Sequence, residues 1–235
     1  MDNLREMLLS IVNNMAKETY RSIVLDILNN PTLTFTSTKP LIQLGESPAA
    51  PRKHHFFSGG LLLHTLSVAL IARSIAKIFE NLYGVDVDED LVVSAAILHD
   101  IFKYYQYAVD DASGGYKPRD DWYLSHDYAI VAELSRRNAP DALIRVVSEA
   151  HGIAPFSTIE GLIVHLADSI DARFGEYLQN ILLSKLKEIE KEGCNIYKIL
   201  NELIKRYGLR NVVQEAQKSG LTQKAIAVCK EGADK

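Results

Sequence analysis

The sequence is short of cysteine and lacks a long apolar run. Its two cysteines, Cys194 and Cys229, have no second Cys or His at zinc-finger spacing, so we expect free thiols in a reducing compartment. No apolar run approaches the roughly 20 residues that cross a bilayer. The charged residues Asp2, Arg5 and Glu6 do not suit a secretory signal. These absences together predict a soluble cytoplasmic protein without a membrane partner.

The chain also has no excess of positive charge. Its net charge is -4 at pH 7, which does not favour a broad basic surface for phosphates, although a local basic pocket remains open. A nucleic-acid partner is therefore possible but not favoured. The length of 235 residues and the 47% hydrophobic content predict a compact globular protein with a sizeable core.

Strand-like alternation is scarce, whereas apolar residues recur at helical spacing, and this pattern predicts an all-α protein. Helices are expected up to about Asn30, over 58–83, from 86 through 105, and from Ser125, Pro140 and Ser157 onward. Ser157 and Glu160 fit a capping box at the start of the last of these. Residues 31–51 are expected to form a long ordered loop, and residues 110–121 a mobile loop.

No linker-like composition divides the chain, so we expect a single domain over residues 1–235. Its core is expected at about 50–180. The helices expected over 181–235, with breaks near Gly193 and Gly208, would be peripheral to that core, as would the N-terminal helices. The sequence does not give the oligomeric state.

All seven histidines lie in the middle of the chain, at positions 54, 55, 64, 99, 126, 151 and 165. On a helical wheel, His64 shares its side with Val68 and Ile71, while Lys77 falls roughly opposite. His64 is therefore expected to point inward. A single inward histidine is more often a satisfied core residue than a metal ligand, so this position alone does not decide.

His99 and Asp100 end the apolar run over residues 92–98. An ionised carboxylate buried there is costly unless a cation or several donors meet it, and a metal supplies that compensation. Lys103 lies one turn on, at a wheel position between the two, from which its ammonium can meet a phosphate oxygen. The competing interpretation is an exposed lysine on a half-buried helix.

Three further polar residues are individually weaker candidates. His126 and His151 occupy expected helix ends, where a histidine is more commonly a capping or dipole partner. Asp168 is flanked on the wheel by His165 and Asp171. That face fits either solvent or a polar pocket, and the sequence leaves both interpretations open.

The ordered set His64, His99, Asp100, Lys103, His126, His151 and Asp168 resembles the HD superfamily of metal-dependent phosphohydrolases. The stretches HHFFSGGLLLHTLSVA, AAILHDIFKYY, SEAHG and LIVHLADSIDARF extend the resemblance over about residues 50–175. They are similar to archaeal phosphodiesterases of dihydroneopterin 2',3'-cyclic phosphate, which are closer in size. They are also similar to bacterial 3'-to-5' exoribonucleases that carry an OB-fold, but no β-rich segment precedes residue 50 here.

The resemblance implies an HD-type helical bundle and one or two divalent metal ions, drawn from Fe, Mn, Ni, Co and Zn. One metal would be held by His64, His99, Asp100 and Asp168, and a second by His126 and His151 with Asp100 bridging. Asp100 and Lys103 would be the catalytic residues. Two departures weaken the match: Ala150 precedes His151 where the family often has a histidine, and Phe102 stands where the family has glycine.

The expected reaction is hydrolysis of a phosphodiester in a small cyclic or nucleotide-like phosphate by metal-bound hydroxide, with Lys103 adding positive charge as the leaving oxygen departs. Three alternatives stay open: an exoribonuclease acting on RNA, a non-catalytic nucleotide-binding sensor and a helical scaffold. The scaffold would make the whole ligand set a coincidence. The roles of His54, His55 and Asp171 are not assigned.

Overall fold

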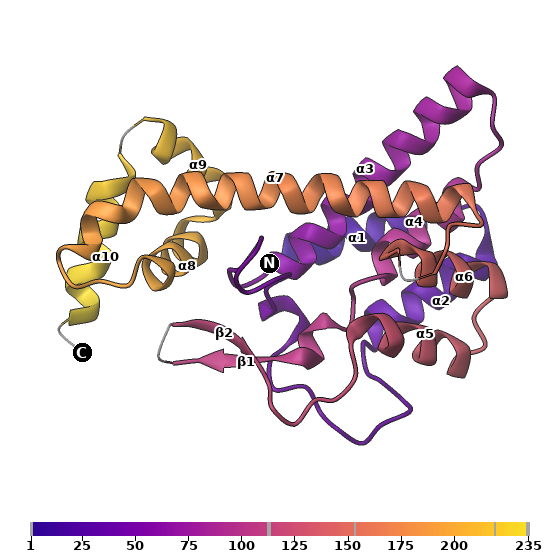
Figure 1. Cartoon of the computed structure of the whole chain (residues 1–235), viewed down its shortest axis with the longest axis horizontal. Helices are drawn as coiled ribbons and strands as arrows, with labels where there is room; N and C mark the ends of the chain where they lie inside the picture. Colours follow the sequence, from indigo (N-terminus) through magenta and orange to yellow (C-terminus); the bar gives the residue numbers. More distant parts are fainter. Residues whose placement is uncertain (1, 112–113, 153, 219, 234–235) are drawn as a thin grey trace.

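The computed structural model describes residues 2–111, 114–152, 154–218 and 220–233. Figure 1 shows a helical molecule in which one long helix runs from the larger part of the protein to the C-terminal helices. The helices of the larger part are α1 (Asp2–Asn13), α2 (Glu18–Asn29), α3 (Gly60–Tyr83), α4 (Glu89–Leu98), α5 (His126–Arg136) and α6 (Asp141–Ala150). The long helix α7 (Ile159–Glu190) leads to α8 (Ile196–Tyr207), α9 (Leu209–Gln217) and α10 (Leu221–Ala233). The predicted all-α class is confirmed.

Helix α4 is the centre of the core. Every residue from Leu91 to Leu98 is buried, as expected for a helix that is apolar all round. Asp88 caps its N-terminus by accepting a hydrogen bond from the backbone N–H of Leu91. Helices α3, α6 and α7 pack around α4. The functional residues at the end of α4 therefore lie deep inside the protein.

Helix α3 is long and apolar enough to cross a membrane by length and composition alone, although it contains His64, Arg73 and Lys77. Half of its most apolar window is buried inside the protein, and the helix packs against α4 and α7. These contacts are those of a core helix. The helix ends at Gly84, which adopts a left-handed conformation that glycine accepts without strain.

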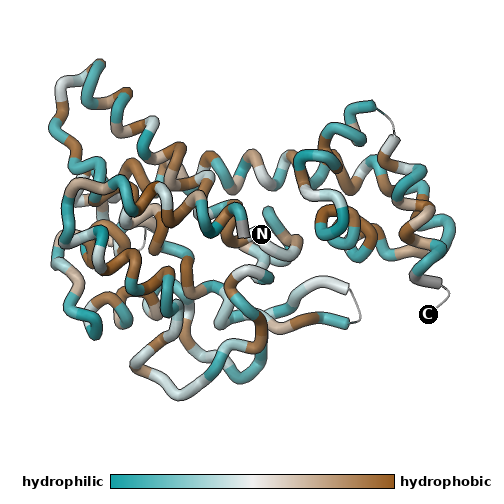
Figure 2. The backbone as a smooth tube through the Cα atoms, turned by 180° about the vertical axis from the view of Figure 1, so that it is seen from behind, coloured by the Kyte–Doolittle hydropathy of each residue, from teal (hydrophilic) through white to brown (hydrophobic). Residues whose placement is uncertain are grey.

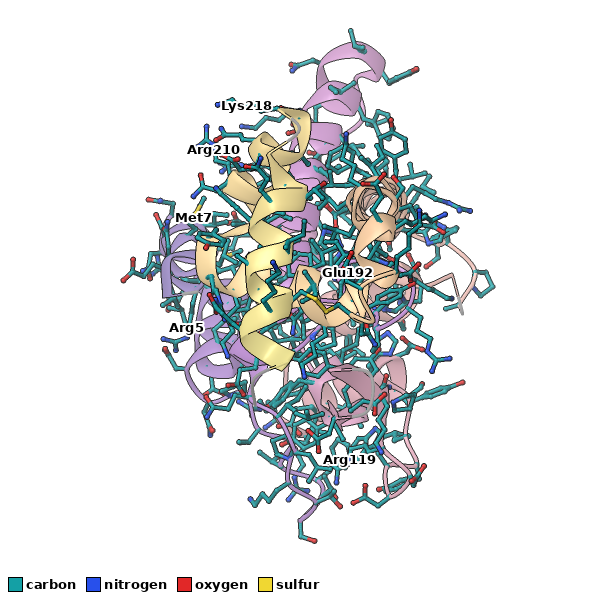
Figure 3. The ribbon with its side chains drawn as sticks, turned by 90° about the vertical axis from the view of Figure 1, so that its left-hand side faces the viewer. Arg5, Met7, Arg119, Glu192, Arg210 and Lys218 are labelled. Carbon is teal, nitrogen blue, oxygen red and sulfur yellow. A yellow bond between two sulfur atoms is a disulfide. The ribbon has the colours of Figure 1, made fainter. Side chains whose placement is uncertain are left out.

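The buried apolar residues form two clusters, which Figure 2 shows as apolar segments in the larger part and again in the C-terminal helices. The second cluster joins the C-terminal half of α7 with α8, α9 and α10, and it includes Phe56 and Phe57 from the segment before α3. Figure 3 looks onto this end of the molecule, where Arg210 and Lys218 mark the C-terminal helices. The division into one domain with peripheral helices stays a prediction.

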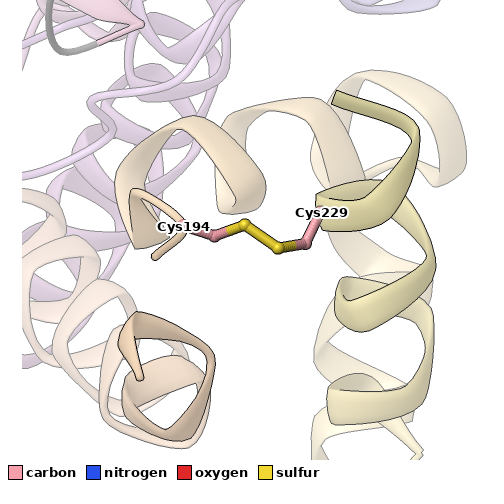
Figure 4. The surroundings of a disulfide bond; sticks show 2 residues. All are labelled: Cys194 and Cys229. Carbon is pink, nitrogen blue, oxygen red and sulfur yellow. A yellow bond between two sulfur atoms is a disulfide. The ribbon is translucent and has the colours of Figure 1, made fainter. Parts of the chain in front are cut away.

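The expectation of two free thiols is wrong. Cys194, in the turn before α8, forms a disulfide with Cys229 of α10 (Figure 4), with Cα atoms 6.1 Å apart. The two positions are separated by 35 residues, and only the packing of α8 against α10 brings them together. Sequence spacing carried no signal for this contact.

Several predicted helix boundaries also need correction. The helix expected up to Asn30 is divided into α1 and α2 at residues 14–17. The helix expected through residue 105 stops at Leu98, and a separate 3-10 turn, η2 (Lys103–Gln106), follows. The N-cap of α7 is Thr158 rather than Ser157. The hydroxyl oxygen of Thr158 accepts a hydrogen bond from the backbone N–H of Gly161. The hydroxyls of both Ser157 and Thr158 donate to the buried carboxylate of Glu149.

The expected mobile loop over residues 110–121 contains part of a hairpin, although residues 112–113 lie outside the described part of the chain. Strands β1 (Tyr107–Asp110) and β2 (Gly115–Pro118) pair antiparallel, with Tyr107 opposite Pro118. Arg119, which Figure 3 labels, donates hydrogen bonds to the carbonyl oxygens of Lys39 and Tyr105. It thereby fastens the loop over 31–51, whose one helical turn is η1 (Leu44–Glu46), to the core.

Candidate metal centre

His64 lies on α3 and is fully buried, which confirms the inward direction expected from the helical wheel. Its Nδ1 lies 2.6 Å from Oδ2 of Asp171 on α7. A carboxylate on Nδ1 fixes the ring and leaves Nε2 free to bind a metal. Nε2 of His64 faces Asp100 and Asp168.

His99 and Asp100 follow the last residue of α4, and both are fully buried. His99 is the C-cap of the helix, and its Nδ1 lies 2.8 Å from the carbonyl oxygen of Ala96. This contact also directs Nε2 into the site. The end of α4 thus delivers an imidazole nitrogen and a carboxylate side by side.

Four side-chain atoms converge at what we call the first position: Nε2 of His64, Nε2 of His99, Oδ2 of Asp100 and Oδ1 of Asp168. Nε2 of His64 lies 3.2 Å from the Asp100 oxygen and 3.1 Å from the Asp168 oxygen. Nε2 of His99 lies 3.6 and 3.8 Å from the same two oxygens. Metal–ligand bonds of about 2.0–2.2 Å place neighbouring donors about 2.8–3.6 Å apart. Three of these four separations lie in that range and the one between His99 and Asp168 exceeds it slightly, so a transition-metal ion fits this set after a small side-chain shift.

The second position uses the other oxygen of Asp100. Nε2 of His126 and Nε2 of His151 lie 3.1 and 3.3 Å from Oδ1 of Asp100. His126 is the first residue of α5, with its Nδ1 3.3 Å from the amide nitrogen of Gln106, and His151 is the C-cap of α6. The structure therefore gathers the other five predicted metal-ligand residues around the buried carboxylate of Asp100.

Five of these donor atoms are buried, and within the described part of the chain they have no hydrogen-bond partner. They are Nε2 of His64, His99, His126 and His151, and Oδ1 of Asp100. A buried polar atom without a partner costs about 1–3 kcal/mol. Convergent unpaired ligand atoms of this kind fit divalent metals, and one ion at each of the two positions would satisfy all five of them.

A search of known families and proteins agrees with this geometry. Residues 61–173 match the family model for the HD domain. Over 211 residues, the chain is 33% identical to the dihydroneopterin 2',3'-cyclic phosphate phosphodiesterase of Methanocaldococcus jannaschii, a match that covers 88% of this chain and 84% of that protein. The chain belongs to the HD family of metal-dependent phosphohydrolases.

Two other HD-domain relatives are 3'-5' exoribonucleases named YhaM. The chain is 30% identical over 166 residues to the protein of Bacillus velezensis and 28% identical over 164 residues to that of Bacillus subtilis. Each match covers 62% of this chain, but only 47% and 50% of the respective exoribonuclease. No solved structure gives a significant match.

The charges within the HD centre are strongly coupled. Burial lowers the pKa of His64, but the surrounding carboxylates of Asp100, Asp168 and Asp171 outweigh burial and raise it to about 10. Burial raises the pKa of Asp100, but the charges of Lys103 and His99 outweigh it and hold this pKa well below its usual range. Because the pKa of His64 is raised, binding of a metal at its Nε2 would displace a proton from the ring.

Lys103 contacts the centre although the helix predicted to carry it ends earlier. Its Nζ lies 2.5 Å from Oδ2 of Asp100, at the start of the turn η2. Phe102, which replaces the family's glycine, is buried in the core rather than left in the site. Burial lowers the pKa of Lys103, and Asp100 outweighs this and raises it.

Helix α7 resolves the two interpretations of Asp168. Its polar face points inward: Asp171 is buried, and Asp168 is largely covered. The apolar residues opposite face outward, with Ile170 50% exposed and Leu166 36% exposed. The face that carries Asp168 therefore lines a polar pocket, because the interior that it meets is the HD centre.

Several residues around the HD centre had no predicted role. His54 and His55 are buried behind His64, and burial lowers their pKa values to about 3 and about 4, so both are neutral at pH 7. Ligand atoms of His54, His55 and His64 lie within 4.8 Å of one another, but Nδ1 of His64 contacts Asp171, and Nδ1 of His54 contacts Nδ1 of His55. Asp127, on α5, was missed entirely, since an acidic residue in a first turn resembles an ordinary helix-dipole partner.

Proposed function

We propose that this HD protein is a phosphodiesterase that opens a cyclic phosphate of a small molecule. The observation that carries the proposal is the sharing of Asp100, whose two oxygens face two separate sets of imidazole and carboxylate donors. A carboxylate in this place would serve both sets, and a pair of metal ions would supply the activated water and the charge neutralisation that displacement at phosphorus needs.

The residues have separable tasks in this proposal. His64, His99, Asp100 and Asp168 would hold one metal, and Asp100, His126 and His151 would hold another. When bound, such metals lower the pKa of a water molecule and neutralise charge on phosphate oxygens. Asp171 and the carbonyl of Ala96 orient the imidazoles, so that both rings present Nε2 to the centre.

Lys103 is the other proposed catalytic residue beside Asp100. Its ammonium is held at the rim of the centre by Asp100, with 12% of its side chain exposed. From this place it can stabilise negative charge on the leaving oxygen as the phosphodiester bond breaks. Asp100 would fix the lysine as well as the metals.

The mixed imidazole and carboxylate ligands suit Fe, Mn, Ni, Co or Zn better than Mg alone. The small-molecule substrate class follows from the relative in M. jannaschii, whose match covers most of both chains. The exoribonuclease alternative has a narrower basis, because only about half of each YhaM protein is matched. RNA therefore serves as the competing substrate in the test below.

We propose a cytoplasmic location for the protein. The disulfide between Cys194 and Cys229 weighs against it, because disulfides are rare in the cytosol outside hyperthermophiles. Alkylation of free thiols before lysis, followed by mass measurement, decides whether this bond exists in the cell.

The function is tested with protein purified without chelators and analysed for bound metals. A 2',3'-cyclic nucleotide, dihydroneopterin 2',3'-cyclic phosphate and a short RNA are then assayed side by side. A variant with both His99→Ala and Asp100→Ala is the inactive control. A variant with Asp141→Asn is the matched control, since Asp141 is an exposed acidic residue at the start of α6.

We expect opening of a cyclic substrate by the wild-type protein and by the Asp141 variant, and none by the double variant. Equal turnover by the double variant would remove the active-site assignment. Progressive shortening of RNA without opening of the cyclic substrates would replace the proposal with the exoribonuclease. Metal binding without turnover of any substrate would replace it with the sensor.

A further inference from the structure

Asp127 lies in the first turn of α5, next to His126. Its Oδ2 lies 3.3 Å from the hydroxyl of Ser125, which donates a hydrogen bond to it. Its Oδ1 is buried and, among the described residues, has no hydrogen-bond partner. One oxygen is therefore held by the side chain of Ser125, the N-cap residue of α5, and the other is buried without a hydrogen-bond partner among the described residues.

The free oxygen points to the second position. Oδ1 of Asp127 lies 2.8 Å from Nε2 of His126 and 3.3 Å from Nε2 of His151. Oδ1 of Asp100 lies 3.1 and 3.3 Å from the same two nitrogens. Each of the two Nε2 atoms thus lies close to two carboxylate oxygens. The separations match those of neighbouring ligands on one metal, about 2.8–3.6 Å.

With Asp127 included, the two positions have the same composition. The first position offers two imidazole nitrogens and two carboxylate oxygens, from His64, His99, Asp100 and Asp168. The second then also offers two nitrogens and two oxygens. Without Asp127 it would have three protein ligands, because Ala150 supplies no donor beside His151.

An acidic residue in a first helical turn is ordinarily explained by the helix dipole. That explanation accounts for a carboxylate near the N-terminus of α5, but it does not account for a buried oxygen aimed at two imidazoles. Asp141 provides the comparison within this chain. It occupies the first turn of α6 in the same way, yet it is exposed.

We propose that Asp127 is a metal ligand and that it completes a four-ligand second position with Asp100, His126 and His151. The inference rests on the proposed metal-dependent function and adds to it a fixed capacity of two transition-metal ions per chain.

The test compares the wild-type protein with the variants Asp127→Asn, Asp127→Ala and Asp141→Asn. Each is stripped of metal, dialysed against Mn²⁺ and analysed for metal per chain, and the binding of Mn²⁺ is measured by calorimetry. We expect two ions in the wild-type and Asp141 proteins. We expect one tightly held ion in both Asp127 variants, with the second bound at least about 10–100-fold more weakly.

The first ion serves as the folding control, since its affinity in the Asp127 variants should equal that in the wild-type protein. Two ions bound with wild-type affinity in both variants would overturn the inference. If both variants fail to fold, the wild-type protein is crystallised with Mn²⁺. An anomalous peak about 2.0–2.2 Å from Oδ1 of Asp127 then supports the inference that Asp127 is a ligand. A carboxylate that is turned away from the peak overturns it.

These outcomes are separate from those that test the activity. Two ions in the Asp127 variants, together with active wild-type protein, would remove the inference and leave the proposed function. One ion in the variants, together with wild-type protein that turns over no cyclic phosphate, would leave the inference and remove the proposed function.

Discussion

The two positions of the HD centre are built on different kinds of structure. The first is held by α3, the end of α4 and the N-terminal part of α7, and three of its four ligands, His64, His99 and Asp100, are completely buried, whereas Asp168 keeps 20% of its side chain exposed. The second takes its ligands from helix ends, and His126 and His151 keep 17% and 16% of their side chains exposed. Ligands on packed helices are more rigid than ligands beside loops. The first metal should therefore bind tightly, and the second should exchange faster.

The strongest test of the comparison removes the residue that both positions share. Asp100→Asn is expected to lower turnover on the order of 10⁴-fold, because both positions lose an anionic ligand together. Metal analysis should show fewer than one ion per chain. Circular dichroism is the folding control, and retention of two ions by a folded variant would show that Asp100 is not the bridge.

Removing one imidazole from each position separates them. His64→Ala and His151→Ala should each bind one ion fewer than the wild-type protein, but they should lose different ions. The ion left in the His151 variant should be the slowly exchanging one, and the ion left in the His64 variant should exchange fast. Competition with a chelator measures both rates. Equal exchange rates for the two remaining ions would remove the distinction between the positions.

A smaller effect is expected from the partner of His64. Asp171→Asn weakens the contact that orients the imidazole, so the first ion should bind about 10–100-fold more weakly. The second ion should be unaffected, because Asp171 does not contact that position. Calorimetry with Mn²⁺ measures both affinities, and an equal loss at both positions would contradict the assignment.

The smallest effect is expected on the stability of the protein, at Gly175 of α7, which packs against His55. A methyl group on Gly175 of α7 would lie 2.3 Å from Cε1 of the buried His55. Gly175→Ala should therefore lower the free energy of unfolding by about 1–3 kcal/mol. Gly45→Ala is the control, since the space around Gly45 is open. Thermal unfolding measures both, and equal stability of the two variants would show that His55 yields to the methyl group.

The same contrast explains what the sequence could predict. His64 lies on a long regular helix, so a helical wheel gave its inward direction, and His99 and Asp100 ended an apolar run whose burial was expected. Asp168 needed the fold, because the wheel cannot tell a solvated face from a polar interior. Only the structure shows that Leu166 and Ile170, which lie opposite Asp168 on α7, are the exposed residues.

Asp127 and the disulfide could not be predicted for a related reason. Asp127 depends on the loop that brings the start of α5 to the end of α6, and its local sequence is that of any helix N-terminus. The contact of Cys194 with Cys229 depends on how α8 and α10 pack. Helical periodicity describes one element at a time, and these features arise between elements.

The number of metal ions that turnover needs is measured by titrating the metal-free protein with Mn²⁺ while the opening of a 2',3'-cyclic phosphate is followed. We expect little turnover at the first equivalent, a rise that levels off near the second, and no rise in the Asp100→Asn variant. A plateau at one equivalent would contradict a two-metal centre. Full turnover without metal would contradict the HD centre as the site of the reaction.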